Sequence, residues 1–223
     1  MKKTLFYVAG IAALSMLASC GGNSQQSENA DSAAQAGENA GTYAVDAANS
    51  SLEWRGSKII AASEHKGTIG IKEGSLSVEG GKVVAGSFVI DMNSIKNTDL
   101  TDTGYQKKLV GHLMAEDFFN VAKFPTGKFE IVSVEEKASE GNTHEVSGNL
   151  TLRDSTRKIT FPATIKVEGN TVTATGKATI NRFEWGITYD KNNLNLFEKG
   201  KRDFEQGVVN KEMEISISLK ANR

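Results

Sequence analysis

The chain has 223 residues and nearly balanced charge, with 26 basic and 27 acidic side chains. Because it lacks a basic cluster, we expect no nucleic-acid partner. The single cysteine has no partner for an intramolecular disulfide, and it excludes four-cysteine zinc sites and iron–sulfur clusters.

The first twenty residues have the layout of a bacterial lipoprotein signal. Two lysines precede an apolar run that is too short for a comfortable membrane span, which favours a cleaved signal peptide over residues 1–19. The segment Leu17-Ala18-Ser19-Cys20 resembles a lipobox. That resemblance implies that Cys20 becomes the first residue and carries a diacylglycerol and an amide-linked acyl chain such as palmitate. Stable membrane anchoring needs two such chains.

The position after the cysteine bears on location. Gly21 stands where some bacterial lipoproteins carry the aspartate that retains them in the inner membrane, so we expect an outer-membrane anchor in the cell envelope. An ordinary secreted protein and a short transmembrane anchor are the alternatives.

Residues 20–41 follow as a low-complexity segment of small and polar residues, without aromatic or β-branched side chains after Cys20. This composition predicts a flexible linker. The remaining residues, 42–223, are enough for one domain with a substantial core.

Alternation with period two dominates residues 42–223 and predicts antiparallel strands with one dry face and one wet face. The apolar stripes are Leu52 and Trp54; Val84, Gly86, Phe88, Ile90 and Met92; Phe129 and Ile131; Val146, Gly148, Leu150 and Leu152; Ile159, Phe161, Ala163, Ile165 and Val167; Val172, Ala174, Gly176, Ala178 and Ile180; and Met213, Ile215, Ile217 and Leu219. Seven or more such strands must close into a barrel or pack as a sandwich to cover their apolar faces.

Turn signals lie between these stripes. Gly80-Gly81 and Gly169-Asn170 supply the positive φ angles of tight hairpins, which favours a meander of consecutive strands. Leu109 and Leu113 are four residues apart, which predicts a short helix over residues 105–114. Residues 191–203 are polar and predict a loop.

Four blocks of sequence resemble the YceI-like family. The first is the segment 112–125, in which a His-Leu pair precedes Asp117-Phe118-Phe119-Asn120 and an aromatic-Pro pair. The blocks 43–54, 146–162 and 181–187 are similar to the family's opening strand, its Gly-x-Leu-Thr-Leu hairpin and its late Arg-x-x-aromatic-Gly motif. Two departures accompany them: Val110 and Gly111 replace an arginine and an acidic residue that the family often has, and residues 191–203 are longer and more polar.

The resemblance implies an all-β fold, an antiparallel lipocalin-like barrel of about eight strands with a short helix, whose apolar lumen holds a long isoprenoid chain. His112 and Arg182 are candidates for the mouth of this cavity. We further expect the inward-facing small residues Gly86, Gly148, Ala163, Ala174, Gly176 and Ala178 to leave room inside. The candidate lining residues are Trp54, Phe88, Ile90, Phe129, Ile131, Leu150, Phe161, Ile165, Ala174, Gly176, Ile180 and Trp185.

Catalysis and metal binding have little support in the sequence. His65, His112 and His144 are scattered without the spacing of a zinc triad, and no Gly-x-Ser-x-Gly motif is present. We therefore expect a lipid-binding protein rather than an enzyme. Its ligand is the bound lipid, and we expect no cofactor and no metal. Two alternatives stay open: a structural or stress-protective lipoprotein with a filled barrel, and a metal enzyme that uses the histidines.

Overall fold

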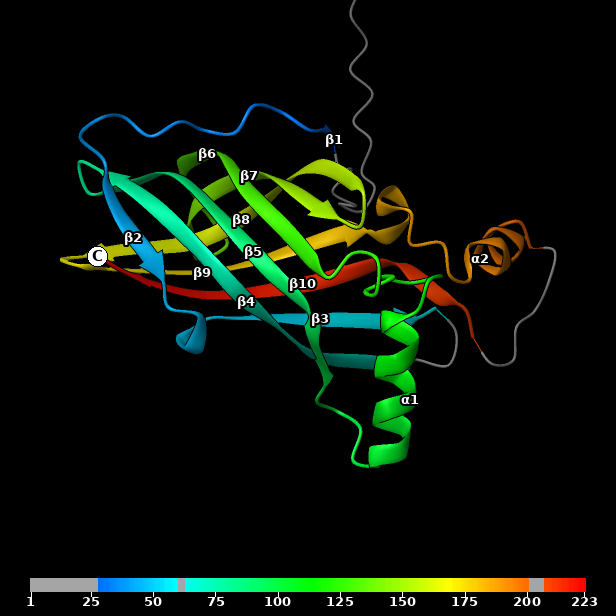
Figure 1. The fold of residues 1–223 in the computed structure, drawn as a ribbon. Helices are drawn as coiled ribbons and strands as arrows, with labels where there is room; N and C mark the ends of the chain where they lie inside the picture. The colour runs from blue at the N-terminus through cyan, green and yellow to red at the C-terminus, as the bar shows by residue number, and fades with distance from the viewer. Residues whose placement is uncertain (1–27, 60–62, 201–206) are drawn as a thin grey trace, which may run out of the picture.

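The computed structural model describes residues 28–59, 63–200 and 207–223 (Figure 1). The predicted signal peptide and Cys20 lie outside the described residues. Within the described residues, no helix is long and apolar enough to span a membrane. The strands are β1 (Glu28–Asn29), β2 (Gly41–Val45), β3 (Ser51–Lys58), β4 (Glu64–Glu79), β5 (Lys82–Asn97), β6 (Thr126–Ser139), β7 (Asn142–Leu152), β8 (Ser155–Glu168), β9 (Thr171–Asn181) and β10 (Val209–Asn222).

Eight of these strands, β3 to β10, form a closed antiparallel barrel. Each pairs with the next along the chain, and β10 returns to pair with β3, where Ile215 lies opposite Trp54. The short strand β2 extends the wall between β4 and β10. The predicted all-β, lipocalin-like antiparallel barrel is therefore confirmed, since closure covers the apolar face of every strand.

The predicted hairpin turns are present. Gly80 and Gly81 adopt φ angles of 56° and 80° between β4 and β5, and Gly169 adopts 58° between β8 and β9. The predicted apolar stripe that begins at Val84 is wrong at its first residue, because Val83 faces the interior instead. The register of β4 against β5 shifts between Ser77 and Val78, and such a bulge reverses which face the following residues occupy.

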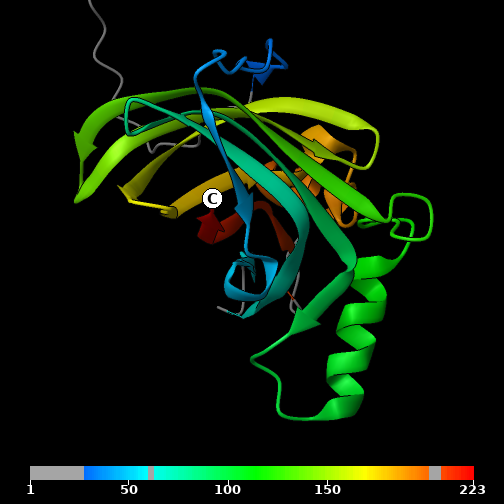
Figure 2. The ribbon, with the colours of Figure 1, turned by 60° about the vertical axis from the view of Figure 1, so that its left-hand side comes forward.

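Two α-helices and two 3-10 turns, η1 (Ala47–Asn49) and η2 (Arg182–Trp185), complete the described elements. The predicted helix over residues 105–114 is confirmed as α1 (Thr103–Met114), which lies outside the barrel next to β5 (Figure 2). Asp102 caps it by accepting a hydrogen bond from the backbone N–H of Tyr105. The predicted loop over 191–203 is wrong in part, because Lys191–Glu198 form α2. Leu194 is the single buried residue of α2, so the sequence of this segment lacks the repeated apolar positions that predict a helix.

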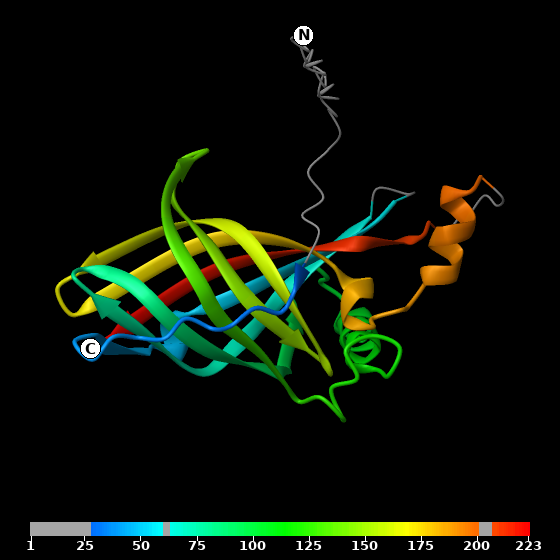
Figure 3. The same ribbon diagram turned by 90° about the horizontal axis from the view of Figure 1, so that it is seen from above.

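The linker segment that the structure describes, residues 28–41, lies along the outside of the barrel (Figures 1 and 3). Strand β1 pairs with Arg157 and Lys158 of β8, and the backbone N–H of Ala34 donates to the carbonyl of Ile131 in β6. Composition alone did not indicate this attachment, which depends on contacts with distant strands.

Candidate functional site

The barrel encloses a cavity lined by side chains from all eight strands. The cavity has a volume of about 130 Å³. The lining residues are Leu52, Trp54, Ile69, Ile71, Leu76, Val83, Phe88, Ile90, Met92, Phe119, Phe129, Ile131, Val146, Leu150, Leu152, Ile159, Phe161, Ala163, Ile165, Val172, Ala174, Thr175, Gly176, Ala178, Met213, Ile215, Ile217 and Leu219.

The lining is apolar throughout. Among the described residues that line it, Thr175 is the one exception and none is charged. An apolar cavity offers water no hydrogen-bond partners, so it stays free of water and can bind an apolar molecule. The site therefore suits a hydrocarbon and cannot stabilise a charge.

The cavity extends along the strands. On β10 its lining residues run from Met213 to Leu219, a length of roughly 20 Å at about 3.3 Å per residue. A cavity that extends this far along the strands can accommodate an extended chain.

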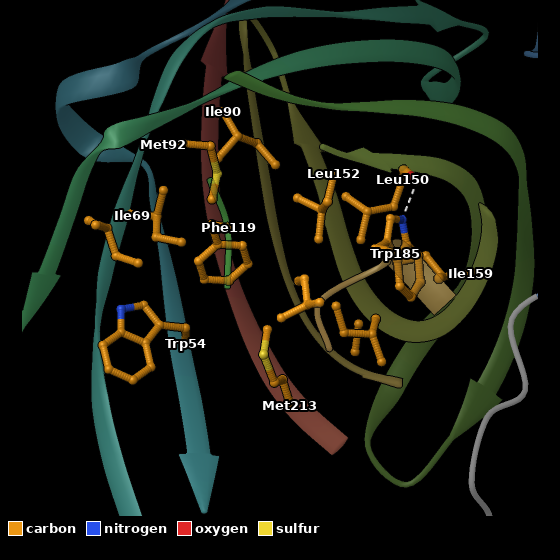
Figure 4. Packing of buried hydrophobic residues seen from close by; sticks show 14 of the residues in the cluster. Trp54, Ile69, Ile90, Met92, Phe119, Leu150, Leu152, Ile159, Trp185 and Met213 are labelled. Atoms are coloured by element: carbon orange, nitrogen blue, oxygen red, sulfur yellow. Dashed lines mark hydrogen bonds between the residues drawn. The ribbon is translucent and has the colours of Figure 1, made fainter. Parts of the chain in front are cut away.

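The structure places ten of the twelve candidate residues on the cavity wall. They are Trp54, Phe88, Ile90, Phe129, Ile131, Leu150, Phe161, Ile165, Ala174 and Gly176. Ile180 and Trp185 are fully buried but are not among the lining residues. Trp185 instead packs in the core beside the cavity and donates its indole N–H to the carbonyl of Leu150 at 2.9 Å (Figure 4).

Aromatic rings form a continuous group on one side of the wall. The rings of Phe88 and Phe129 stack with centroids 6.2 Å apart, and the ring of Phe161 lies 5.9 Å from that of Phe129. Aromatic pairs at these separations add stability beyond their buried area. They give this part of the cavity a defined shape.

The small residues on the inner stripes divide into two groups. Ala163, Ala174, Gly176 and Ala178 line the cavity as expected. Gly86 and Gly148 do not, because neighbouring side chains already occupy the space in front of them: a Cβ on Gly148 would lie 2.1 Å from the ring of Phe129. The expectation that these two glycines leave free volume is wrong.

Arg182, a predicted mouth residue, is completely buried and is not among the lining residues. Its guanidinium donates to the carbonyls of Asn210, Ile187 and Val209 at 2.9, 3.0 and 3.3 Å. Burial lowers the pKa of Arg182 to about 10, so the group remains charged at neutral pH. It joins the turn after β9 to the start of β10.

His112, the other predicted mouth residue, lies in the last turn of α1 and is also not among the lining residues. Its ring packs edge-on against Tyr189 with centroids 4.2 Å apart, and its Nε2 lies 3.8 Å from Oδ2 of Asp117. These contacts hold the end of α1 against the segment that follows η2.

The other two histidines lie elsewhere. Nδ1 of His65 is 2.8 Å from Oδ2 of Asp99, and Nδ1 of His144 is 2.6 Å from the hydroxyl of Thr143. Across residues 28–59, 63–200 and 207–223, no three His, Cys, Asp or Glu side chains gather in a way that could hold a metal ion.

Several lining residues were missing from the candidate set. Met92 and Met213 are on predicted stripes, so the alternation alone could have supplied them (Figure 4). Phe119 reaches the cavity from the segment after α1, outside any strand, and period-two alternation could not identify it.

The fold and the cavity define the class: a lipocalin-like antiparallel barrel with an enclosed apolar lumen. The model of the YceI-like domain matches residues 43–221. The chain belongs to the YceI-like family.

Individual relatives agree with this assignment. A UPF0312 protein of Yersinia pestis (strain Pestoides F) is 34% identical over 93 residues, 38% of this chain and 46% of the relative. A UPF0312 protein of Pseudomonas paraeruginosa is 36% identical over 100 residues, 42% of this chain and 50% of the relative. The matched segments thus span about half the length of these curated relatives.

Two solved structures share the fold. Burkholderia cenocepacia BcnA has a TM-score of 0.55 at 21% identity, covering 80% of this chain and 99% of that one. A polyisoprenoid-binding domain from Saccharophagus degradans, implicated in plant cell wall breakdown, has a TM-score of 0.53 at 16% identity, covering 81% of this chain and 97% of that one.

Proposed function

We propose that this protein binds one long, slender apolar chain, of the isoprenoid class, in the lumen of its barrel, and that it carries or shields that chain at a bacterial membrane. The observation that carries the proposal is the cavity, whose 28 lining residues in the described part of the chain include one polar residue, Thr175. A relative of the same fold is a polyisoprenoid-binding domain, which supports the choice of ligand.

The energetics favour a hydrocarbon. Each Å² of apolar surface that leaves water contributes about 25 cal/mol, before the costs of association are subtracted. Since no charged side chain faces the lumen, the tail supplies the binding energy. A polar head group would lose its hydration there without a partner.

The two tryptophans allow a direct test. Trp54 lines the cavity, whereas Trp185 is buried beside it. Dibromostearic acid, which quenches tryptophan on contact, should therefore quench Trp54, and the quenching should survive in Trp185→Phe and disappear in Trp54→Phe. Geranylgeraniol should displace the probe and restore the fluorescence. Equal quenching of both tryptophans, or none, would contradict binding in the lumen.

We further propose that Cys20 carries the lipid anchor, on the outer membrane. The proposal rests on the sequence around Cys20 and on the need for two acyl chains for stable attachment. Cys20→Ser should move the protein from the detergent-extracted membrane fraction to soluble export or to an uncleaved precursor. Unchanged fractionation with no lipid mass on the mature N-terminus would refute the anchor.

A further inference from the structure

The barrel wall forks between β5 and β6. The two strands pair over only five positions, from Asp91 opposite Thr126 to Ser87 opposite Glu130. Beyond Glu130, β6 continues beside β7, while β5 continues beside β4 to the turn at Gly80. Figure 3 shows the end of β6 curving away from the rest of the barrel.

A bulge explains the fork. The register of β6 against β7 shifts between Ile131 and Ser133, directly after the last β5–β6 pair, and a bulge bends the strand that contains it. In the described residues, an ion pair between Lys82 and Glu136, with 3.0 Å between Nζ and Oε1, joins the two strands beyond the fork, and both side chains are exposed. Exposed pairs of this kind contribute about 0–1 kcal/mol. Beyond Glu130, the described residues of β5 and β6 form no backbone pairs, so the wall is less strongly joined at the fork than along its continuous ladders.

The cavity lies directly behind this fork. Phe88 and Phe129, which pair one position before the fork and whose rings stack, both line the cavity, as do Val83 of β5 and Ile131 of β6 beyond it. The other interrupted ladder, where β8 and β9 stop pairing at Ala163, has the turn η2 packed against it.

The N-terminal segment crosses the outside of the fork. We call residues 31–40 the strap. At its start, Asn149 of β7 holds the backbone of Asp31 on both sides, accepting from its N–H at 3.0 Å and donating to its carbonyl at 2.6 Å. The N–H of Ala34 then donates to the carbonyl of Ile131, at the residue where β5 has left β6. After the strap, Gly41 begins β2 and pairs with Val78 in β4.

The strap is attached lightly between these points. Residues 35–39 are exposed, and the residues of the strap are mostly alanine, glycine and short polar side chains. Asn149, in contrast, is buried beneath it. A segment with few buried apolar contacts opens at low free-energy cost while the barrel stays folded. The two hydrogen bonds of Asn149 thus fix the start of the strap to β7.

We propose that the β5–β6 fork is the portal through which a single aliphatic chain enters the cavity, and that the strap is its lid, latched by Asn149. This inference rests on the proposed lipid-binding function. The strap begins eleven residues after Cys20, so a lipid anchor there would tether the N-terminal end of the lid to the membrane.

A disulfide that locks the strap tests the lid. Asp31→Cys with Asn149→Cys replaces the latch by a covalent bond, and Ser147→Cys with Thr160→Cys is the matched control, because those hydroxyls are 2.7 Å apart on the neighbouring strands β7 and β8. Uptake of cis-parinaric acid from phosphatidylethanolamine–phosphatidylglycerol vesicles is followed by its fluorescence. The oxidised lock should slow uptake at least tenfold relative to its reduced form, and the oxidised control should not.

Removing the hydrogen bonds of Asn149 tests whether the strap limits the rate of uptake. Asn149→Ala should speed uptake at least threefold without changing the amount bound at equilibrium. Asn222→Ala, which loses the hydrogen bond that its side chain accepts from the Thr171 hydroxyl, should have no effect. Equal uptake rates in the oxidised and reduced lock, or in Asn149→Ala and the native protein, would overturn the lid and leave the binding function standing. No probe bound at equilibrium in any variant would overturn the binding function itself.

Discussion

Gly148→Ala should destabilise the barrel and disturb its cavity at the same time. The added Cβ would lie 2.1 Å from Cζ and 2.6 Å from Cε2 of Phe129, and 2.8 Å from the carbonyl oxygen of Glu130. Ordinary contacts begin at 3.4 Å, so the ring must move by about 1.3 Å to restore one. Because Phe129 also packs against Phe88 and Phe161, that movement disrupts the aromatic wall.

Overpacking of this kind costs about 1–3 kcal/mol. For a chain of this size each kcal/mol lowers the melting temperature by about 2–4 °C, so Gly148→Ala should melt about 2–12 °C below the native protein. Gly56→Ala is the control, since a Cβ there meets nothing within 4 Å. Calorimetry or guanidinium unfolding compares the two. A Gly148→Ala protein as stable as Gly56→Ala would refute the packing of Phe129 over Gly148.

Two further substitutions test the lumen and the acid response. Ala174→Phe, on the cavity wall, should reduce lipid uptake at a stability cost of about 1–3 kcal/mol, and undiminished uptake would show that the chain binds elsewhere. Burial raises the pKa of Asp99, but hydrogen bonds from His65, the Lys66 N–H and Asn97 outweigh it and hold the pKa below the usual 3.8. The unfolded chain therefore takes up a proton there first as pH falls, so this stabilisation is present above about pH 4 and is lost below it. Asp99→Asn should flatten the dependence of urea unfolding on pH between 4 and 2, and an unchanged slope would exclude Asp99 as a contributor.

The barrel was predictable because its signal is local and repeated. Each strand has one dry face, and the turns at Gly80-Gly81 and Gly169 fix the order of the hairpins. Most of the cavity wall followed for the same reason, since alternation assigns side chains such as Phe161 to the interior without knowledge of their neighbours.

The remaining features depend on contacts that the sequence does not display. The shift that brings Val83 inward comes from a bulge against β4, and the space in front of Gly148 is taken by a ring from another strand. Arg182 resembled a mouth residue by its motif, yet it is completely buried and donates to three backbone carbonyls, one in the nearby turn at Ile187 and two at the start of β10. The attachment of Asp31 to Asn149 spans 118 positions of sequence.

Native mass spectrometry tests the central claim, that the lumen holds one apolar chain. The protein extracted from its membrane in mild detergent should carry one non-covalent lipid per chain, which is lost on denaturation, whereas a covalent anchor on Cys20 would remain. The same adduct should be depleted in Ala174→Phe and retained in a combined His65→Ala, His112→Ala and His144→Ala variant. A protein without such an adduct that also fails to take up geranylgeraniol, or one that carries a stoichiometric metal lost with the histidines, would contradict the account.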